Sequence, residues 1–169
     1  MEILQQLSET IDNFRYFTEP PKTEMEFDVK DIIEKSITLI SPSFKLSFIQ
    51  LENKLEKDCY LYGSPREFSS VLLNILNNAR DILERKKIAN PKVKIKLSQV
   101  EEKVVIKISD NAGWIPFNII DKIFESGFIN KEKDFGFGLF IAKNIIEKKM
   151  NAKLSVRNTK EGAEFRIEV

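Results

Sequence analysis

The stretch from Ser64 to Lys86 carries the strongest folding signal in the sequence. It opens with Ser64-Pro65-Arg66-Glu67, where a serine N-cap, a proline at the first helical position and a glutamate three residues after the serine predict a helix start with a capping box. Apolar residues then recur with a period of 3.6 along one face. They are Phe68, Val71, Leu72, Ile75, Leu76, Ala79, Ile82 and Leu83. We therefore expect a long amphipathic helix with its apolar stripe in a core.

The remaining segments predict the layer on which such a helix would pack. Strands are expected at Met25–Phe27, Phe44–Gln50, Asp58–Leu61, Lys92–Ser98, Lys103–Ser109, Lys153–Arg157 and Glu164–Val169. Further helices are expected from an Asp28 cap to about Leu39, near Phe117–Phe124, and from about Gly138 to Lys149. This order predicts an α+β two-layer sandwich, with a mixed, mostly antiparallel sheet and helices on one face.

The N-terminal segment has a different pattern. Leu4, Leu7, Ile11 and Phe14 recur at alternating spacings of three and four, which predicts a helix over residues 1–17 that packs against a partner helix. Two prolines follow. We therefore expect a helical segment at 1–19, a linker at 20–23 and one domain at 24–169.

Composition excludes several kinds of chemistry. The 169 residues contain no histidine and one cysteine, so a histidine base, a histidine metal site and a zinc site are excluded within this chain. The net charge is +1, no basic stretch is interleaved with aromatic residues, and the run Glu84–Lys87 is interpreted as a solvated helix end. No apolar run approaches the roughly 20 residues of a membrane helix. We expect no nucleic-acid partner and no membrane contact by this fragment.

Three features suggest where chemistry occurs. Asn74 and Asn78 lie one helical turn apart, so their amides can converge on a cation such as Mg²⁺; two solvated surface amides are the alternative. Asp110 leaves a strand into a tight turn and can accept a hydrogen bond from a ligand amine, although the same residues also form ordinary turns. Gly136 and Gly138 lie at the expected start of a helix, where free backbone amides suit phosphate binding. The alternative is a loop that needs glycine only for its backbone conformation.

Together these features resemble the nucleotide site of sensor histidine kinases, in the ATPase superfamily shared with gyrase, heat-shock chaperones and mismatch-repair proteins. LLNILNNARDIL resembles the asparagine box, DNAGWIP the first glycine box, IFESGF the phenylalanine box, and DFGFGLFIAKNIIEKKM the second glycine box. GAEFRIEV resembles the closing strand, and LSETIDNFRYF the second helix of the dimerisation and phosphotransfer module. The resemblance covers roughly residues 24–169. It implies a Bergerat-type ATP-binding fold that uses ATP and Mg²⁺.

The resemblance also assigns roles to individual residues. Asn78 would be the Mg²⁺ ligand and Asn74 its catalytic partner in holding metal or phosphate, while Asp110 would read the adenine amine. The remaining nucleotide contacts would be Ala112, Gly113, Ile115, Phe124, Lys131, Gly136, Phe137, Gly138 and Leu139, with Lys131 in a lid at 126–135 and Ile115, Phe124 and Leu139 lining the adenine pocket.

One residue bears on the reaction type. ATP-hydrolysing members of the superfamily have a glutamate base where this chain has Asn74, and an amide cannot take a proton from water. The resemblance therefore implies a protein histidine kinase domain that donates the γ-phosphoryl group to a histidine upstream of this chain. Ala112, Trp114, Ser126-Gly127 and Asp134 depart from the family pattern. They leave open a degenerate domain that serves as a protein-interaction module, and an anti-sigma-type serine kinase is a further alternative.

The same resemblance implies partners and a location. These are the helical dimerisation and phosphotransfer domain of the same protein, a second copy in a full-length homodimer, and a response regulator in a two-component phosphorelay. The expected location of this fragment is the cytoplasm, whether or not the full-length protein is membrane-anchored.

Overall fold

The computed structural model describes residues 23–126 and 137–169. The expected N-terminal helix, most of the linker, almost all of the expected lid with Lys131, and Gly136 lie outside these residues. The described elements are β1 (Met25–Asp28), α2 (Val29–Leu46), β2 (Gln50–Leu55), β3 (Tyr60–Gly63), α3 (Pro65–Arg85), β4 (Lys92–Val100), β5 (Lys103–Asp110), α4 (Phe137–Asn144), the π-helical turn η1 (Ile145–Lys149), β6 (Lys153–Asn158) and β7 (Ala163–Glu168).

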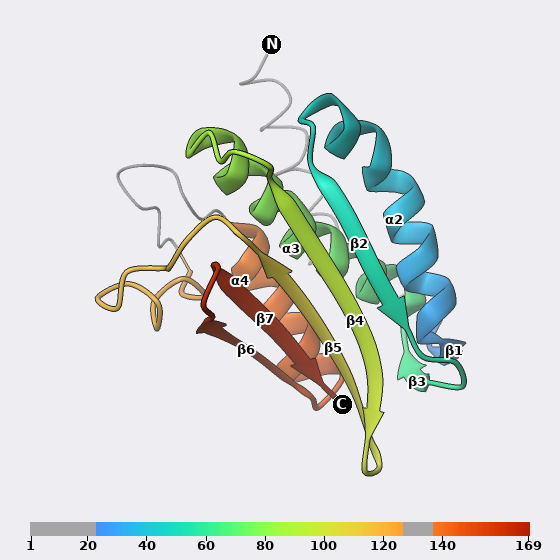
Figure 1. Ribbon diagram of the computed structural model, residues 1–169. Helices are drawn as coiled ribbons and strands as arrows, with labels where there is room; N and C mark the ends of the chain where they lie inside the picture. Colours follow the sequence, from blue (N-terminus) through green and yellow to red (C-terminus); the bar gives the residue numbers. More distant parts are fainter. Residues whose placement is uncertain (1–22, 127–136) are drawn as a thin grey trace.

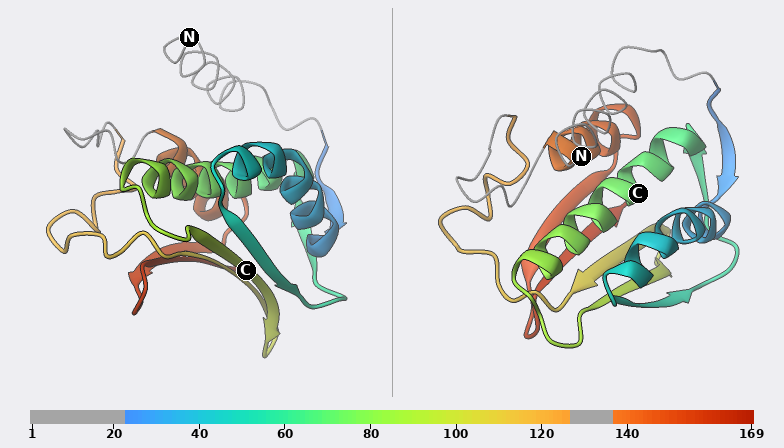
Figure 2. Two further views of the ribbon diagram at one scale, coloured as in Figure 1. Left: turned by 45° about the horizontal axis from the view of Figure 1, so that its top comes forward. Right: turned by 90° about the horizontal axis from the view of Figure 1, so that it is seen from above.

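The main sheet has five strands in the order β2-β4-β5-β7-β6, and β1 pairs with β3 in a separate two-stranded sheet. Only β2 and β4 run parallel in the main sheet; the other pairs are antiparallel. The helices lie in a layer over one face of this sheet and leave the other face open (Figure 1; Figure 2, left). The predicted two-layer α+β sandwich is confirmed.

Helix α3 forms the centre of the helical layer. Its N-cap is Ser64, whose hydroxyl accepts a hydrogen bond from the Glu67 amide at 3.3 Å. All eight predicted stripe residues are buried, including Phe68 and Ile75 at 0% exposure. The Glu67 carboxylate itself pairs with Lys149 at 2.5 Å instead of completing the expected capping box. This contact ties the start of α3 to the end of η1.

Helix α2 corrects two predictions. It starts as expected, because the Asp28 carboxylate caps it by accepting from the Lys30 amide at 2.9 Å. It does not end near Leu39, however, but continues through Pro42 to Leu46. The strand expected at Phe44–Gln50 is therefore wrong, and β2 begins only at Gln50.

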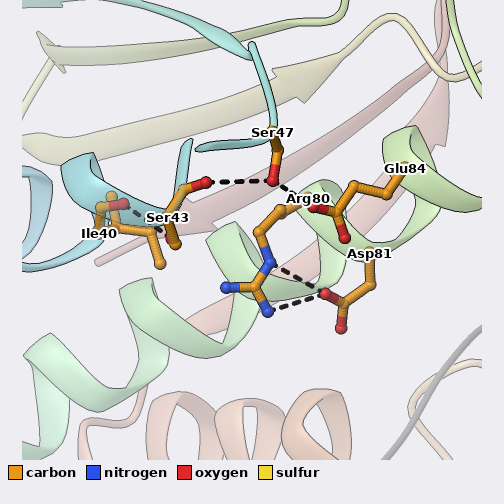
Figure 3. Close-up of polar contacts among 6 residues, drawn as sticks. All are labelled: Ile40, Ser43, Ser47, Arg80, Asp81 and Glu84. Carbon is orange, nitrogen blue, oxygen red and sulfur yellow. Dashed lines mark hydrogen bonds and ion pairs between the residues drawn. The ribbon is translucent and has the colours of Figure 1, made fainter. Parts of the chain in front are cut away.

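Side-chain hydrogen bonds accompany this extension (Figure 3). The Ser43 hydroxyl donates to the Ile40 carbonyl at 2.8 Å, and the Ser47 hydroxyl contacts the Ser43 carbonyl at 3.0 Å and the Glu84 carboxylate on α3. Phe44 is buried at 2% exposure between the layers. Its burial outweighs the cost of Pro42, which removes one backbone donor.

Most of the remaining predicted elements are confirmed, and one is wrong. The β4–β5 hairpin, the helix beginning near Gly138 and the β6–β7 hairpin are confirmed, although the second half of that helix is π-helical. Residues Phe117–Phe124 form successive turns and no regular helix, with backbone bonds such as Lys122 N–H to the Ile119 carbonyl at 2.8 Å. Cys59 is fully buried, and burial raises the pKa of its thiol, as expected for a structural cysteine. Within the described residues, no helix is both long and apolar enough to cross a bilayer.

Candidate nucleotide site

Two predicted residues lie on the flank of α3 with unsatisfied amides. The Nδ2 atoms of Asn74 and Asn78 are buried and have no hydrogen-bond partner among the residues that the structure describes. A buried donor without a partner costs roughly 1–3 kcal/mol, so such groups are normally satisfied by a ligand or by water. An amide supplies an oxygen for a hard cation and an N–H for an anion. Both side chains are partly buried, and their buried nitrogens argue against the alternative of two solvated surface amides.

The start of α4 lies directly against this pair. A Cβ atom added at Gly138 would lie 3.2 Å from Asn74 Oδ1 and 3.3 Å from Asn74 Cγ, tighter than almost all such contacts. A larger residue at this position would therefore have to displace the Asn74 side chain by a few tenths of an ångström. Leu139 follows and is buried in the core, whereas Phe137 is exposed and packs edge-to-face on Phe140 at 6.3 Å.

A pocket lies further along α3, at its C-terminal end. It is lined by Asp110, Ala112, Gly113 and Ile115 from the predicted set, together with Ile82, Arg85, Lys86, Trp114, Pro116, Ala163 and Phe165. Ile82 is one helical turn beyond Asn78 and two turns beyond Asn74, or about 6 and 12 Å along the axis. The structure thus arranges the pocket and the two asparagines along one flank of the same helix.

Asp110 is the buried anionic group of this pocket, with 7% exposure. Burial raises the pKa of its carboxyl, and this effect is opposed by hydrogen bonds from the backbone N–H groups of Ala112 and Ala163 and by the charge of Lys86. The Ala112 amide donates to Asp110 Oδ1 at 2.9 Å. A buried carboxylate at a pocket wall is suited to accept a hydrogen bond from a ligand amine.

The loop after Asp110 is held by the turn between β6 and β7. The Asn158 side chain binds Ile115 twice, accepting from its amide at 2.8 Å and donating to its carbonyl at 2.9 Å. The Gly113 amide donates to the Glu161 carbonyl at 3.2 Å. These bonds fix the shape of a loop that has little regular structure of its own.

Trp114 is one of the residues that line the pocket. Its ring is 56% exposed, its indole N–H donates to the Thr159 carbonyl at 2.5 Å, and it packs edge-to-face on Phe117 at 5.9 Å. The indole is therefore a half-exposed wall of the pocket that also contains Asp110. Phe124 lies behind the pocket, where its ring meets Phe165 at 6.1 Å and the Lys143 ammonium lies 4.7 Å from its centroid.

Sequence reasoning missed several residues of this site. Lys86 was assigned to a solvated helix end, but its ammonium donates to the Ala112 carbonyl at 2.9 Å beside Asp110. Asn158 and Gly162 showed no signal beyond a turn between two strands. Their contacts with the pocket loop join parts of the chain more than forty residues apart, which no local pattern reveals.

Comparisons with known proteins show the family to which the chain belongs. Residues 63–169 match the family model described as histidine kinase-, DNA gyrase B-, and HSP90-like ATPase. The sensor histidine kinase CssS of Bacillus subtilis is 27% identical over 149 residues, which cover 88% of this chain and 32% of CssS. Sporulation kinase A of the same organism is 26% identical and is covered over 23% of its length. The chain thus spans a third or less of these relatives.

The fold matches solved histidine kinase structures. A nucleotide-free catalytic domain of histidine kinase ThkA superposes with a TM-score of 0.77 and 24% identity, covering 87% of this chain and 96% of that domain. The same kinase in complex with the response regulator protein TrrA gives a TM-score of 0.82 and 23% identity, covering 99% of this chain and 48% of the kinase. The matched family, the sensor kinase relatives and the shared fold show that this chain belongs to the histidine kinase-, DNA gyrase B-, and HSP90-like ATPase family and contains the ATP-binding catalytic domain of sensor histidine kinases.

Proposed function

We propose that this domain binds Mg²⁺-ATP along the flank of α3 and donates the γ-phosphoryl group to a histidine on a separate helical module. The observation that carries the proposal is the pair of buried, unpartnered amides of Asn74 and Asn78 beside Gly138. The unpartnered Nδ2 groups are donors that suit phosphate oxygens, and the Oδ1 atoms of the same amides are the kind of ligand that Mg²⁺ takes. Asn78 would hold Mg²⁺, which neutralises phosphate charge when bound, and Asn74 would position metal or phosphate.

The pocket at Asp110 would receive the adenine. The carboxylate would accept a hydrogen bond from the exocyclic amine, and the buried Ile115 side chain would supply an apolar contact. Ala112 and Gly113 would bring the backbone close to the base. On the phosphate side, Gly138 and the N-terminus of α4 would contribute free amides and the positive end of the helix dipole.

Asn74 also bears on the type of reaction. An amide cannot act as a general base for water, so the site favours transfer of the phosphoryl group to a protein acceptor over hydrolysis. The acceptor must lie on another segment, since this chain contains no histidine. By analogy with the sensor kinase relatives, we propose a dimerisation and phosphotransfer domain as that acceptor, a homodimeric full-length protein and a response regulator downstream.

A phosphotransfer assay tests the proposed reaction. The chain is incubated with Mg²⁺-ATP labelled at the γ-phosphate and with a separately produced helical acceptor domain of the same protein. We expect acid-labile label on the acceptor histidine and none on this chain. Label on this chain, or an acceptor that stays unlabelled while ATP binding is confirmed, would contradict the proposed transfer.

Base selectivity gives a second test, through Asp110→Asn. Guanine presents a carbonyl oxygen where adenine presents the amine. In the unmutated chain the Asp110 carboxylate would then face another hydrogen-bond acceptor, which is unfavourable. We expect the unmutated chain to prefer ATP over GTP by at least about tenfold. The variant should bind ATP more weakly, with a smaller difference between its affinities for ATP and GTP. Equal affinities for ATP and GTP in the unmutated chain would exclude Asp110 as the base reader.

The same variant predicts a pH effect on the ligand-free protein. Because burial raises the pKa of Asp110, its contribution to stability is present at low pH and is lost as the pH rises through that pKa. Asparagine carries no charge at any pH. The stability of Asp110→Asn relative to the unmutated chain should therefore increase as the pH rises from below 4 to neutrality, as measured by urea unfolding at each pH.

A further inference from the structure

The open face of the main sheet carries an unusual arrangement of charge. Within residues 23–126 and 137–169, the helices all lie on the other side of the sheet (Figure 2, left). Strand register places Lys54 of β2 opposite Lys96 of β4, Lys96 opposite Lys107 of β5, and Lys107 opposite Arg166 of β7. Neighbouring strands lie about 4.8 Å apart, so four cations stand in one row about 15 Å long. Like charges directly opposite each other destabilise a sheet, and folding alone gives no reason for this row.

The charge extends beyond the row. The outward positions of the five strands carry the cations Lys54, Lys92, Lys94, Lys96, Lys103, Lys107, Lys153, Arg157 and Arg166, and the carboxylates Glu52, Glu164 and Glu168. Nine cations against three carboxylates give this face a net charge of +6. The entire chain has a net charge of +1, so positive charge is concentrated on one side of the molecule.

The three carboxylates compensate only part of the face, and Arg166 is the one member of the row that they pair with. The ion pairs are Lys92–Glu52 at 3.1 Å, Arg157–Glu164 at 2.8 Å, and Lys103–Glu168 and Arg166–Glu168 at 2.8 and 2.7 Å. Among the described residues, Lys54, Lys94, Lys96 and Lys107 have no ion-pair partner, and Arg166 Nε is buried without a hydrogen-bond partner. Glu101 and Glu102 lie in the β4–β5 turn, beyond the end of the row.

The residue types on the open face indicate the chemistry of a binding partner. No outward position on the open face is aromatic. Protein interfaces are enriched in aromatic residues and depleted in lysine at their centres, and single-stranded nucleic acids require aromatic stacking platforms. Readers of duplex DNA insert a helix or a strand ribbon into a groove, whereas these cations stand on the face of a sheet. A lysine-rich face without aromatic residues suits a broad anionic surface.

We infer that the open face, centred on the row Lys54, Lys96, Lys107 and Arg166, docks on an anionic lipid bilayer. The attraction is electrostatic and needs no inserted side chain, at about 1 kcal/mol for each lysine or arginine near the headgroups. The expectation of no membrane contact is the opposite, because the lysines alternate with apolar residues on separate strands and form no basic run. Only the register brings them together. The inference is independent of ATP binding and of phosphotransfer.

Vesicle flotation tests the inference on the full chain. Large unilamellar vesicles of phosphatidylcholine with 30% phosphatidylglycerol are compared with pure phosphatidylcholine vesicles at 100 mM salt. We expect binding to the anionic vesicles only, and loss of that binding at 500 mM salt, where screening is strong. The double variant Lys96→Gln/Lys107→Gln should bind about 30-fold more weakly. It relieves like-charge repulsion, so its thermal unfolding should show an intact fold.

The matched control is Lys35→Gln/Lys148→Gln, which removes the same charge from exposed positions in the helical layer. It should lose at most about threefold in vesicle affinity, since these lysines lie away from the open face. Equal losses for the two double variants would show an effect of net charge alone and overturn the inference. It would also be overturned by no binding to anionic vesicles at 100 mM salt, or by tighter binding to a 20-base-pair DNA duplex at the same salt.

Discussion

Gly162→Ala should destabilise the folded domain by about 3 kcal/mol or more and lower its melting temperature by about 6–12 °C. A Cβ at Gly162 would lie 2.2 Å from the Asp110 carbonyl oxygen and 2.8 Å from Asp110 Oδ1. The first of these atoms belongs to the backbone of a buried sheet strand and cannot move aside like the end of a flexible side chain. The turn must therefore move away, and it carries the hydrogen bonds that hold the pocket loop.

The control for this prediction is Glu161→Ala in the same turn. Glu161 is exposed and contacts the pocket loop through its backbone carbonyl, which alanine retains. Its melting temperature should change by no more than about 2 °C. Differential scanning calorimetry of the two variants measures the difference directly. The structure places the turn in close contact with Asp110. A Gly162→Ala protein as stable as the control would contradict that contact.

Asn78→Ala should reduce Mg²⁺-ATP affinity by at least about 100-fold while leaving the ligand-free fold intact. The variant loses the proposed metal ligand. It also removes a buried N–H group that has no partner among the described residues, and alanine is the better helix former. The melting temperature without nucleotide should therefore stay the same or rise slightly. Loss of binding together with loss of stability would instead assign Asn78 a structural role.

Asn77→Ala provides a matched control, because the same residue type is removed one position earlier on α3. Asn77 points about 100° away around the helix and is not among the residues whose amide nitrogen is buried without a partner. Its Mg²⁺-ATP affinity should remain within about threefold of the unmutated chain. Equal losses for Asn77→Ala and Asn78→Ala would mean that the helix surface in general, and no particular amide, supports nucleotide binding.

Local signals explain which parts of the fold could be predicted from sequence. The start and end of α3 were predictable because a cap, a proline and a single apolar stripe all lie within the helix itself. The end of α2 was not, because Ser41-Pro42-Ser43 has the composition of a helix stop. The helix continues there because of tertiary contacts, namely the burial of Phe44 and the bond between Ser47 and Glu84.

The same distinction applies to the site. Asn74, Asn78, Asp110 and Gly138 could be named from sequence because each belongs to a short recognisable box. Lys86 could not, since nothing in a charged helix end reveals that its ammonium reaches the Ala112 carbonyl on another element. The row of cations on the open face could not be predicted from sequence either, because it depends on the register of strands that are distant in sequence.

Two of the residues that depart from the family pattern are Trp114 and Asp134. Trp114 was the largest departure from the family pattern, and an indole could have filled the space that a base needs. In the structure the side chain is half exposed, lines the pocket and donates its indole N–H to the Thr159 carbonyl. Asp134 lies outside the described residues.

Isothermal titration calorimetry with ATP tests the central claim most directly. In the presence of Mg²⁺ we expect saturable binding at one site per chain, with the affinity strongly reduced when Mg²⁺ is chelated. Both results follow if Asn74 and Asn78 are satisfied by metal and phosphate. A folded chain that binds no ATP, or that binds it equally well without Mg²⁺, would contradict the proposed site and favour a domain that acts only as an interaction module.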